Sequence, residues 1–544
     1  MNLSSFFRLC SVFTVVRLCS VFTVVLSGTS ATFAIDILVP LEVPGIQQAI
    51  DLAENGDVII VSAGTWNEAI DFSGKSIEIR SESGPEVTTI EGSLDGPVVT
   101  LESGETNQAL LQGFTIKGGG GVDIAGSRFG GGVYIQGSFP RIRQCLIESN
   151  QASIGGGIFV GGAPSELVLF EEVELRSNLA TDSGGALALI EVPAGISLID
   201  CDIQENHANT VSGAIYCELS SLQMESTTVR LNSSDMLVGA VWLYQSSDGN
   251  FVDCQFSENS SSLVGGALVV SDFSRVTVAD CVFHENSGGA SGGALLFDVG
   301  NDQLLQEVRS CVFFGNVASG SGAHLAVSFN LVNLLVEQCT FGLPGPGSSS
   351  SIRINNEYPE SIFFDSCIVR GGPLPSIEAE SGSVLASYSC IEGLTTSGVD
   401  ALDCIDEDPL FVDATNGNLN LLSGSPCIDN GNPALPLDSD GSAPDMGALG
   451  LAEAGPFRRG DVDADGTTNL ADAIQILGTL FIQGSDPLGC IDAGDCNDDG
   501  LLNISDAVTL LEALFVSGNP LPAPVGDCGA DPTADALECG NFCN

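Results

Sequence analysis

Two twelve-residue segments near the C-terminal end, 461–472 and 495–506, carry oxygen-bearing side chains at alternate positions. A carboxylate or amide stands at positions 1, 3, 5 and 9, a glycine at position 6, and an aspartate at position 12. This pattern is typical of a calcium loop, in which hard oxygen ligands surround the ion, position 7 offers its backbone carbonyl and the glycine allows a sharp turn. The sequence therefore predicts two Ca²⁺ sites. Their ligands would be Asp461, Asp463, Asp465, Thr467, Asn469 and Asp472 in the first, and Asp495, Asn497, Asp499, Leu501, Asn503 and Asp506 in the second.

A helix is expected after each loop, because the aspartate at position 12 has to reach the ion from the start of a helix. Apolar residues do recur at helical spacing after both loops. The same loop and helix occur twice, 34 residues apart, which favours calcium binding over an unoccupied acidic turn. The recurring apolar residues are Ile474, Leu477, Leu480 and Phe481, then Val508, Leu511, Leu514 and Phe515.

Aspartate rather than glutamate at position 12 differs from EF-hand sensors and resembles the dockerin type I family, whose modules carry paired loops of this kind. The resemblance covers 456–520 and implies a cohesin-like domain on a scaffold or cell surface as the partner. The family's contact positions fall here on Leu470–Ala471 and Ile504–Ser505. These pairs are less polar and less alike than the Ser-Thr pairs common in the family. A calcium-stabilised C-terminal module without a docking role is therefore the alternative.

The middle of the chain repeats one short pattern at steps of 26 to 30 residues. A period of this length is one supersecondary unit rather than a domain. Each unit holds short stretches with alternating apolar residues, separated by Gly, Ser and Asn, which predicts two or three strands per unit. Stacked units of this kind form a right-handed single-stranded parallel β-helix. One phase of the repeat is occupied by Cys145, Val173, Cys201, Thr227, Cys254, Cys281, Cys311, Cys339 and Cys367.

Each column of the repeat has an expected place. Alternation puts the cysteine and the apolar residue two places later, such as Phe256, Phe283 and Phe313, inside the coil. We expect buried free thiols, since neighbouring parallel side chains would strain a disulfide. The Gly-rich cluster that follows allows a tight turn. A third column should bend the chain with left-handed backbone angles and form hydrogen bonds along the stack. It contains Asn150, Asn178, Asn206, Asn232, Asn259, Asn286 and Asn316.

The pairing of "FxxN", as at 256–259, with "GGAL" resembles the repeat of the polymorphic outer-membrane protein family. More widely, the chain resembles secreted bacterial β-helix proteins of the pectin-lyase-like class over about residues 35–455. Segment 46–84 resembles that class's N-terminal start, which implies a cap helix near Ile46–Ala53. Segment 406–450 resembles its closing segment. The sequence thus predicts a mainly β protein with a small α-helical C-terminal module.

The charge balance limits the partners. Seventy acidic residues against 16 basic ones give a net charge of −54, which argues against nucleic acid and anionic membranes. This charge favours cations, above all calcium, or life in salty water. Residues 1–34 have the basic, apolar and small-residue order of a secretory signal, and no later stretch has 18 uninterrupted apolar residues. The mature chain is therefore expected to be secreted or at the cell surface, with no membrane span.

The last segment, 521–544, is expected to be a cysteine-containing tail. It follows an extended tether, "GNPLPAPVG". The cysteines in and after the calcium-loop module are odd in number, so one must be free or pair elsewhere. They are Cys490, Cys496, Cys528, Cys539 and Cys543.

Acidic columns beside the cysteines raise the question of catalysis. Acidic residues are so abundant that such columns arise from composition alone, and a catalytic site should interrupt the repeat. His207, His284 and His324 are scattered, with no Ser or Cys in a recognisable triad setting. The sequence therefore assigns no catalytic residue. The columns are Asp200, Asp253 and Asp280, then Glu205, Glu258 and Glu285, then Arg176, Arg230 and His284.

Two functions stay open from the sequence. The first is an exported calcium-binding protein whose acidic repeats contact a polysaccharide or another cell-envelope component. The alternative is a polysaccharide lyase or glycoside hydrolase attached to a polysaccharide-degrading assembly. Trp242 and Tyr244 lie on one face of their strand, inside or outside the coil, and bear on this choice because exposed aromatic rings are typical of sugar sites.

Overall fold

The structure is a computed structural model that describes residues 34–529 apart from short gaps. The expected signal segment lies almost wholly outside the described residues, as does the tail beyond 529 with Cys539 and Cys543. The internal gaps are 299–303, 321, 329–332, 356–361, 372–374, 382–383, 439–440, 451–456, 464, 482–487, 489, 517–519 and 527.

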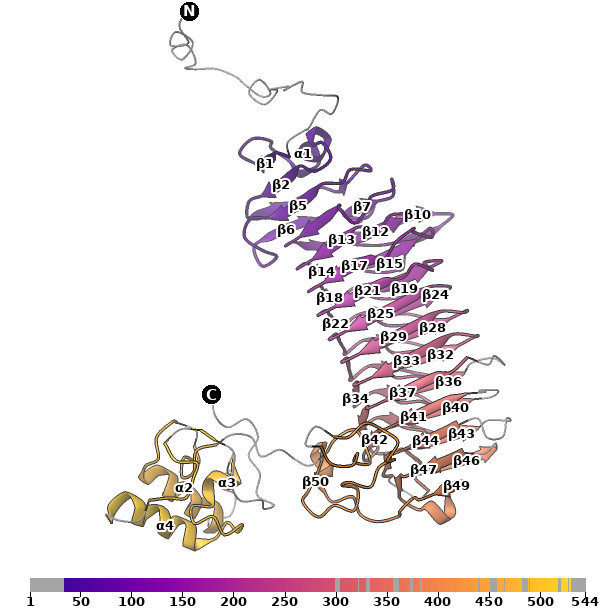
Figure 1. Cartoon of the computed structure of the whole chain (residues 1–544). Helices are drawn as coiled ribbons and strands as arrows, with labels where there is room; N and C mark the ends of the chain where they lie inside the picture. The colour runs from indigo at the N-terminus through magenta and orange to yellow at the C-terminus, as the bar shows by residue number, and fades with distance from the viewer. Residues whose placement is uncertain are drawn as a thin grey trace, which may run out of the picture.

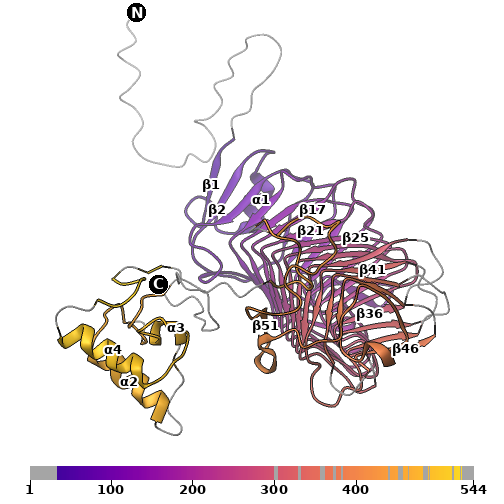
Figure 2. The same ribbon diagram turned by 60° about the horizontal axis from the view of Figure 1, so that its bottom comes forward.

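A parallel β-helix forms most of the described chain (Figure 1). In its middle part, each coil passes through four sheets before it returns one level further along (Figure 2). Each strand pairs in parallel with the equivalent strand of the next coil, so that Trp242 lies beside Val269 and Phe256 beside Phe283. One complete coil consists of β25 (Ser221–Glu225), β26 (Thr228–Arg230), β27 (Ser233–Ser234) and β28 (Val241–Tyr244).

The four sheets differ in length. Among the residues that the structure describes, sheet A has 15 strands, sheet B has 13, sheet C has 12 and sheet D has nine. Two antiparallel hairpins depart from the parallel pairing in the described part of the chain. They are β10 (Val122–Ile124) with β11 (Ser127–Phe129), and β50 (Phe411–Asp413) with β51 (Asn418–Leu421). Sheet A runs from β1 (Asp36–Val39) to β49 (Val399–Leu402), sheet B from β3 (Gly64–Trp66) to β48 (Cys390–Ile391), sheet C from β4 (Ile70–Asp71) to β46 (Ile377–Ser381), and sheet D from β10 (Val122–Ile124) to β39 (Val317–Ala318).

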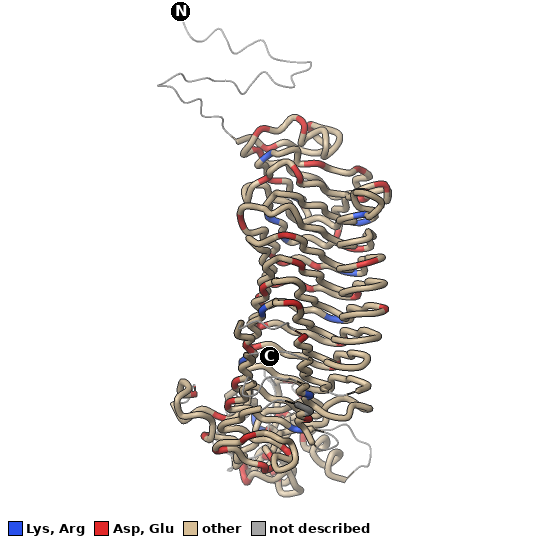
Figure 3. The backbone as a smooth tube through the Cα atoms, turned by 90° about the vertical axis from the view of Figure 1, so that its right-hand side faces the viewer, with Lys and Arg blue, Asp and Glu red and all other residues tan. Residues whose placement is uncertain are grey.

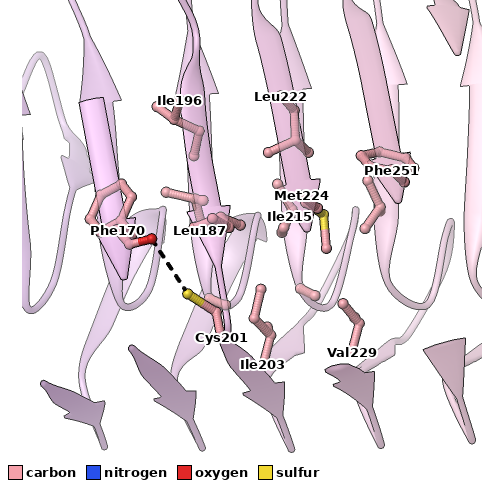
Figure 4. Packing of buried hydrophobic residues seen from close by; sticks show 14 of the residues in the cluster. Phe170, Leu187, Ile196, Cys201, Ile203, Ile215, Leu222, Met224, Val229 and Phe251 are labelled. Carbon is pink, nitrogen blue, oxygen red and sulfur yellow. Dashed lines mark hydrogen bonds between the residues drawn. The ribbon is translucent and has the colours of Figure 1, made fainter. Parts of the chain in front are cut away.

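The inward columns confirm the predicted alternation. Cys281 and Phe283 are both fully buried. The rings of Phe256, Phe283 and Phe313 stack with centroids 4.7 and 4.9 Å apart. Offset stacking of this kind stabilises a core beyond the burial of apolar area. Apolar side chains from neighbouring coils fill the space between the sheets in the same way around Cys201 (Figure 4).

The cysteines of the repeat are free and buried, as expected. The Cys201 thiol donates to the carbonyl of Phe170 on the coil before it (Figure 4). Burial raises the pKa of Cys145 to about 11 and that of Cys201 to about 12. These thiols therefore stay protonated at neutral pH and act as small apolar side chains.

A buried ladder of asparagine amides runs along the turn after sheet B. Asn259 Nδ2 donates to Asn286 Oδ1 at 3.0 Å and to Val229 O at 2.8 Å, and its own Oδ1 accepts from Asn232. The predicted hydrogen bonds along the stack are therefore confirmed. The predicted backbone angles were placed on the wrong residue: the left-handed position is the residue before each asparagine, such as Glu258 at φ 53°.

His324 ends this ladder. The Nδ1 atom of His324 lies 3.0 Å from Asn316 Nδ2, and Nε2 lies 3.0 Å from the carbonyl of Gly342. A carbonyl only accepts, so Nε2 carries the proton and Nδ1 accepts from the amide. Complete burial lowers the pKa of His324 to about 4.

The glycine clusters before sheet C are required by close backbone contact. A Cβ on Gly266 would lie 2.0 Å from the carbonyl oxygen of Gly293 on the next coil. Gly265 beside it has a φ of +69°, which a residue with a side chain rarely adopts. The GGA motif therefore sets how tightly the coils turn.

Both ends of the β-helix are covered. At the N-terminal end α1 (Ile46–Leu52) buries Ile46 and Ile50, close to its predicted range. Its first N–H groups donate to the carboxylate of Glu68, because Gly45 has no side chain to cap them. At the far end the segment with β50 (Phe411–Asp413) and β51 (Asn418–Leu421) packs against the last coils through Leu421, Cys427 and Met446.

In the described part of the small C-terminal region there are three helices: α2 (Leu470–Phe481), α3 (Ile491–Gly494) and α4 (Ile504–Phe515). Ile476 of α2 and Leu510 of α4 share a core of their own. Within the described residues, no helix is both long enough and apolar enough to cross a membrane.

Candidate metal centre

The first acidic loop brings three of its predicted ligands together. One carboxylate oxygen each from Asp461, Asp463 and Asp472 lies within 4.8 Å of the others. Asp472 is placed by the start of α2, where its oxygens accept from the N–H groups of Asn469 at 2.7 Å and Val462 at 2.9 Å. Three converging carboxylates at this spacing can hold a divalent cation.

Asp461 gives a second indication of a cation site. It is buried, and its Oδ2 accepts from the N–H of Gly466 and from Arg458. Its Oδ1 is also buried and has no hydrogen-bond partner among the described residues. A buried carboxylate oxygen without a partner is costly, whereas one that ligates a metal is satisfied. The donor set therefore fits a hard cation such as Ca²⁺.

The other predicted ligands of this loop lie outside the acidic triad. Asp465 Oδ1 accepts from the N–H and hydroxyl of Thr467, which lowers the pKa of Asp465. The carbonyl of Thr467 accepts from Asn469 Nδ2 at 3.0 Å. The loop closes on itself through these bonds, and Gly466 provides the predicted turn with a φ of +83°.

The second loop repeats the same contacts. Asp495 Oδ2 accepts from the N–H of Gly500 at 2.7 Å, as Asp461 does from Gly466. Asp506 Oδ2 accepts from the N–H of Asn503 at 2.7 Å, as Asp472 does from Asn469. The repeated spacing in the sequence therefore corresponds to a repeated three-dimensional loop.

The remaining predicted ligands of the second loop form hydrogen bonds with one another inside the loop. Asn497 Nδ2 donates to Asp499 Oδ2 at 2.9 Å, and Asp499 Oδ1 accepts from the N–H of Leu501. Asn503 Nδ2 donates to the carbonyl of Leu501 at 3.1 Å. Burial and the nearby carboxylate of Asp495 raise the pKa of Asp506 to about 6. Such a rise is what unneutralised neighbouring carboxylates produce, and a bound cation would reverse it.

A buried arginine, which the sequence analysis did not single out, ties the two loops together. Arg459 is fully buried and lies directly before the first loop. Its Nη1 donates to the carbonyl of Asp495 at 2.6 Å, its Nη2 to Asp498 at 2.9 Å, and its Nε to the carbonyl of Ala523. Arg459 therefore holds the start of the second loop and the segment after α4 against the start of the first loop. Only its position two residues before the first acidic loop could have indicated this role.

The apolar stripes of the two helices are divided between core and surface. Leu477 and Leu511 pack against the small core, whereas Ile474 and Val508 are 61% and 48% exposed. The exposed residues occur in pairs separated by the same 34 positions as the loops. These pairs are Leu470 with Ile504, Ile474 with Val508, and Phe481 with Phe515.

The cysteines of this region fit the odd number in the sequence. Cys496 is free and buried, whereas Cys490 and Cys528 are disulfide-bonded. Cys528 belongs to the predicted tail, so the start of that tail is covalently constrained.

The acidic columns of the β-helix lie at its corners. Asp253 and Asp280 precede sheet B, Glu258 and Glu285 follow it, and all four have φ between 53° and 55°. Figure 3 shows acidic residues at every level of the coil. The columns therefore follow the backbone repeat, as the composition argument expects.

In the column that contains Arg176, Arg230 and His284, the two arginines form ion pairs with carboxylates. Arg176 pairs with Glu148 and Arg230 with Asp202, and these bonds raise the pKa of each guanidinium. An arginine held in its charged form is a poor proton acceptor, so neither residue suits the base of a lyase.

One serine and one histidine do come together, contrary to the sequence analysis. His207 Nδ1 lies 2.9 Å from Ser233 Oγ on the next coil, and His207 Nε2 lies 3.6 Å from Asp235. Residues 26 positions apart become neighbours only through the parallel register, so linear proximity could not reveal them. The N–H groups of Ser233 and Asp235 donate to carbonyls of the previous coil, so they do not serve as oxyanion donors.

A shallow groove of 450 Å³ lies at the corner between sheets A and B near the N-terminal end. Three carboxylates line it: Glu86, Glu172 and Glu174. Hydrogen bonds from Gln144 and Arg143 lower the pKa of Glu172, so this group stays ionised. The sequence analysis missed the groove because its carboxylates belong to separate coils.

One family model supports the β-helix fold in the middle of the chain. A family described as "Right handed beta helix region" matches residues 131–302. The solved structure of pectate lyase Pel9A is similar, at 14% identity over 75% of this chain and 91% of its own, with a TM-score of 0.36. A pectin methylesterase from carrot is similar at 14% identity over 54% and 85%, with a TM-score of 0.26. At these TM-scores the two likenesses carry no argument, and none of the curated proteins matches the chain.

Proposed function

We propose that this chain is an exported calcium-binding β-helix protein whose C-terminal region docks it to a partner. The region would bind two Ca²⁺ ions and present the apolar pairs of α2 and α4 to an apolar surface, such as a cohesin-like domain. The β-helix would then place its outer face against the cell envelope or a polysaccharide. Export is supported by the signal-like sequence of residues 1–34.

The observation that carries the proposal is the acidic triad of Asp461, Asp463 and Asp472 with the orphaned Asp461 Oδ1. The equivalent contacts of Asp495 and Asp506 support a second site. In these sites Ca²⁺ would neutralise the buried carboxylates and hold the start of each helix. Asp472 and Asp506 would thereby couple ion binding to the orientation of α2 and α4.

The docking role rests on the exposed pairs. Ile474, Phe481, Val508 and Phe515 are each between 48% and 69% exposed. A group of large apolar side chains on a region this small is typical of a protein interaction site. Because the pairs repeat with the loops, the face offers similar contacts twice.

Calcium titration of the full chain by isothermal calorimetry tests the metal sites. We expect two binding events in the unaltered chain, one in Asp472→Asn and one in Asp506→Asn. Capture of partners from envelope extracts, with Ca²⁺ or with chelator, tests the docking role. We expect the captured protein to be lost with chelator and in an Ile474→Glu, Val508→Glu double variant.

A matched control substitutes exposed leucines away from this face. Leu41 and Leu402 lie on the β-helix and are 80% and 63% exposed. Leu41→Glu and Leu402→Glu should leave capture of the partner unchanged. Ca²⁺ binding without any captured partner would leave a calcium-stabilised module and remove the docking role. Absence of Ca²⁺ binding would remove the whole proposal.

A carbohydrate-active enzyme is the second candidate, and the groove with Glu86, Glu172 and Glu174 is the observation that favours it. Glycoside hydrolysis needs two carboxylates, one as acid and one as base or nucleophile. Release of reducing ends or unsaturated products from a polysaccharide panel tests this function. Activity that disappears in Glu172→Gln or Glu174→Gln and persists in Glu258→Gln would support it, whereas no product with any polysaccharide would exclude it.

A further inference from the structure

The outer face of sheet C carries an aromatic cluster that the docking role does not use. Tyr216 lies on β24 (Ile215–Glu218), and Trp242 and Tyr244 lie on β28. Their ring centroids are 4.9 to 6.3 Å apart. The alternate residues of β28, Val241 and Leu243, are fully buried inside the coil. The sequence does not decide whether Trp242 and Tyr244 point into or out of the coil. The structure places both rings on the outside.

This cluster is the partly exposed section of a longer row of apolar and aromatic side chains along the outer face of sheet C, called the apolar strip below. Towards the N-terminal end the strip is buried, with Tyr134 and Phe159 stacked at 5.6 Å beneath Phe129 of the β10–β11 hairpin. Towards the other end, Val269 and Leu296 are also buried. The chain therefore covers both ends of its own strip.

Between the covered ends, Tyr216, Trp242 and Tyr244 are all partly exposed. The chain has two tryptophans and five tyrosines, and three of these seven residues meet at this one place. Aromatic residues that are rare elsewhere and gathered on an open face indicate a binding surface.

Two of the three rings are held in position by hydrogen bonds. Tyr216 OH donates to Glu218 at 3.0 Å, and Trp242 Nε1 donates to Ser271 at 2.8 Å. Fixed rings lose little conformational entropy when a ligand lies on them. On the next coil, Phe273 follows sheet C with 51% exposure and a φ of 65°, a backbone angle that a bulky residue rarely adopts.

The surrounding charges decide the class of ligand. Glu218 accepts from the Tyr216 hydroxyl, Asp272 directly follows the neighbouring strand β32 (Leu268–Ser271), and Asp298 ends the strand after that. Carboxylates repel a polyanion such as polygalacturonate but accept hydrogen bonds from neutral hydroxyl groups. An uncharged sugar ring has an apolar C–H face and a rim of hydroxyls, so it suits aromatic faces edged by acceptors.

We propose that Tyr216, Trp242 and Tyr244 form a platform that binds an uncharged polysaccharide on the outer face of sheet C. The sugar rings would stack on the aromatic side chains, and their hydroxyls would donate to Glu218 and Asp272. The platform lies on the β-helix and does not depend on the calcium loops.

Tryptophan fluorescence provides a local test, because Trp66→Phe leaves Trp242 as the chain's single tryptophan. The probes are soluble xylan, mixed-linkage β-glucan, galactomannan and polygalacturonate, in buffer with chelator so that a failed docking role does not affect the outcome. We expect at least one uncharged polymer to shift the emission of Trp242 in a saturable manner. Polygalacturonate should give no shift.

Affinity electrophoresis in the same polymers compares the variants. Tyr244→Ala and Trp242→Ala should each weaken binding at least tenfold, whereas Tyr244→Phe should retain most of it. The matched control is Phe363→Ala, an exposed aromatic residue on sheet A at 38% exposure, which should bind as the unaltered chain does. Circular dichroism checks the fold of each variant, and Tyr244→Ser replaces any variant that fails to fold.

Three outcomes would overturn the platform. These are no binding of any uncharged polymer, binding that Tyr244→Ala leaves unchanged, or equal binding of polygalacturonate at low salt. None of these outcomes bears on Ca²⁺ binding or docking, so this proposal and the proposed function fail separately.

Discussion

The β-helix and the C-terminal loops are both built from repeats, but they satisfy buried polar groups in opposite ways. In the β-helix, the amide of Asn259 is the hydrogen-bond partner of the same residue type on each adjacent coil. In the loops, the buried carboxylates of Asp461 and Asp472 converge on one another. An amide both donates and accepts, so a column of amides satisfies itself. A group of carboxylates only accepts and repels, so it needs an added cation.

This difference predicts that the two regions respond separately to solution conditions. The β-helix should be indifferent to chelators and sensitive to any break in its ladder. The C-terminal helices should depend on Ca²⁺ and be indifferent to changes in the coil. The expected effects below decrease in size from complete loss of a region to almost no effect.

Removal of Ca²⁺ should have the largest effect. Chelation should abolish most of the helical circular dichroism of α2 and α4 while the β signal persists, because repulsion between buried carboxylates then opposes folding. Limited proteolysis with mass spectrometry should locate new cleavages between residues 456 and 520. The Asp472→Asn, Asp506→Asn variant should behave as the chelated chain does at any Ca²⁺ concentration. Helices that persist in chelator would contradict the comparison.

Loss of one ladder amide should have the next largest effect. Asn259→Leu removes the side-chain acceptor of the Asn232 N–H and Nδ2 groups and the side-chain donor to the carbonyl of Val229, and it leaves Asn286 Oδ1 with one of its two donors from residue 259. Each unsatisfied buried group costs about 1–3 kcal/mol, so we expect the β-helix to lose about 4 kcal/mol of its free energy of unfolding. Denaturant unfolding followed by β-sheet circular dichroism measures the change. Glu258→Gln, at the neighbouring exposed corner, should unfold as the unaltered chain does.

Acid should weaken the same ladder through His324. Its pKa is about 4 in the folded chain and about 6.5 when unfolded, so the unfolded state binds the extra proton between these values. The stability that neutral His324 contributes is complete above pH 6.5 and is lost as pH falls to 4, by about 3 kcal/mol in total. Below pH 4 no further loss comes from this residue.

The pH dependence can be isolated by substitution. Denaturant unfolding at several pH values, in chelator, should show that His324→Gln removes most of the slope between pH 6.5 and 4. Gln keeps a donor and an acceptor for Gly342 and Asn316, so the variant should fold. An unchanged slope in His324→Gln would assign the acid sensitivity to carboxylates instead.

The sequence predicts the fold well where a single column carries the information. Cys281, Phe283 and Asn286 repeat at fixed spacing, and alternation together with the apolar character of the first two assigns them to the core. The glycines of Gly265–Gly266 mark the tight turn for the same reason. In the first loop, the twelve-residue spacing indicates that Asp461, Asp463 and Asp472 converge, and the calcium-binding roles of the loop positions stay predictions.

Contacts across coils are where sequence reasoning fails. Ser233 meets His207, and Glu86 shares a groove with Glu172, because of a register that no local pattern encodes. The left-handed angle falls on Glu258 rather than Asn259, since the amide is needed for the ladder and the corner is left to its neighbour. Trp242 is ambiguous in the sequence because alternation gives two faces without saying which is inside.

The cysteine column offers the smallest expected effect and the finest test of the comparison. Thr227 occupies this column natively, and its hydroxyl donates to the carbonyl of Glu225 at 2.9 Å. Cys254 makes the equivalent contact, from its thiol to Val252 at 3.2 Å. Cys254→Thr should therefore change the free energy of unfolding by less than about 1 kcal/mol, since the hydroxyl finds the same acceptor.

Cys254→Asp places a charge in the same buried position, where no cation is available, and should prevent folding of the coil. If Cys254→Asp folds and gains stability with Ca²⁺, the β-helix can also use an ion to satisfy a buried carboxylate, and the distinction between the two regions fails.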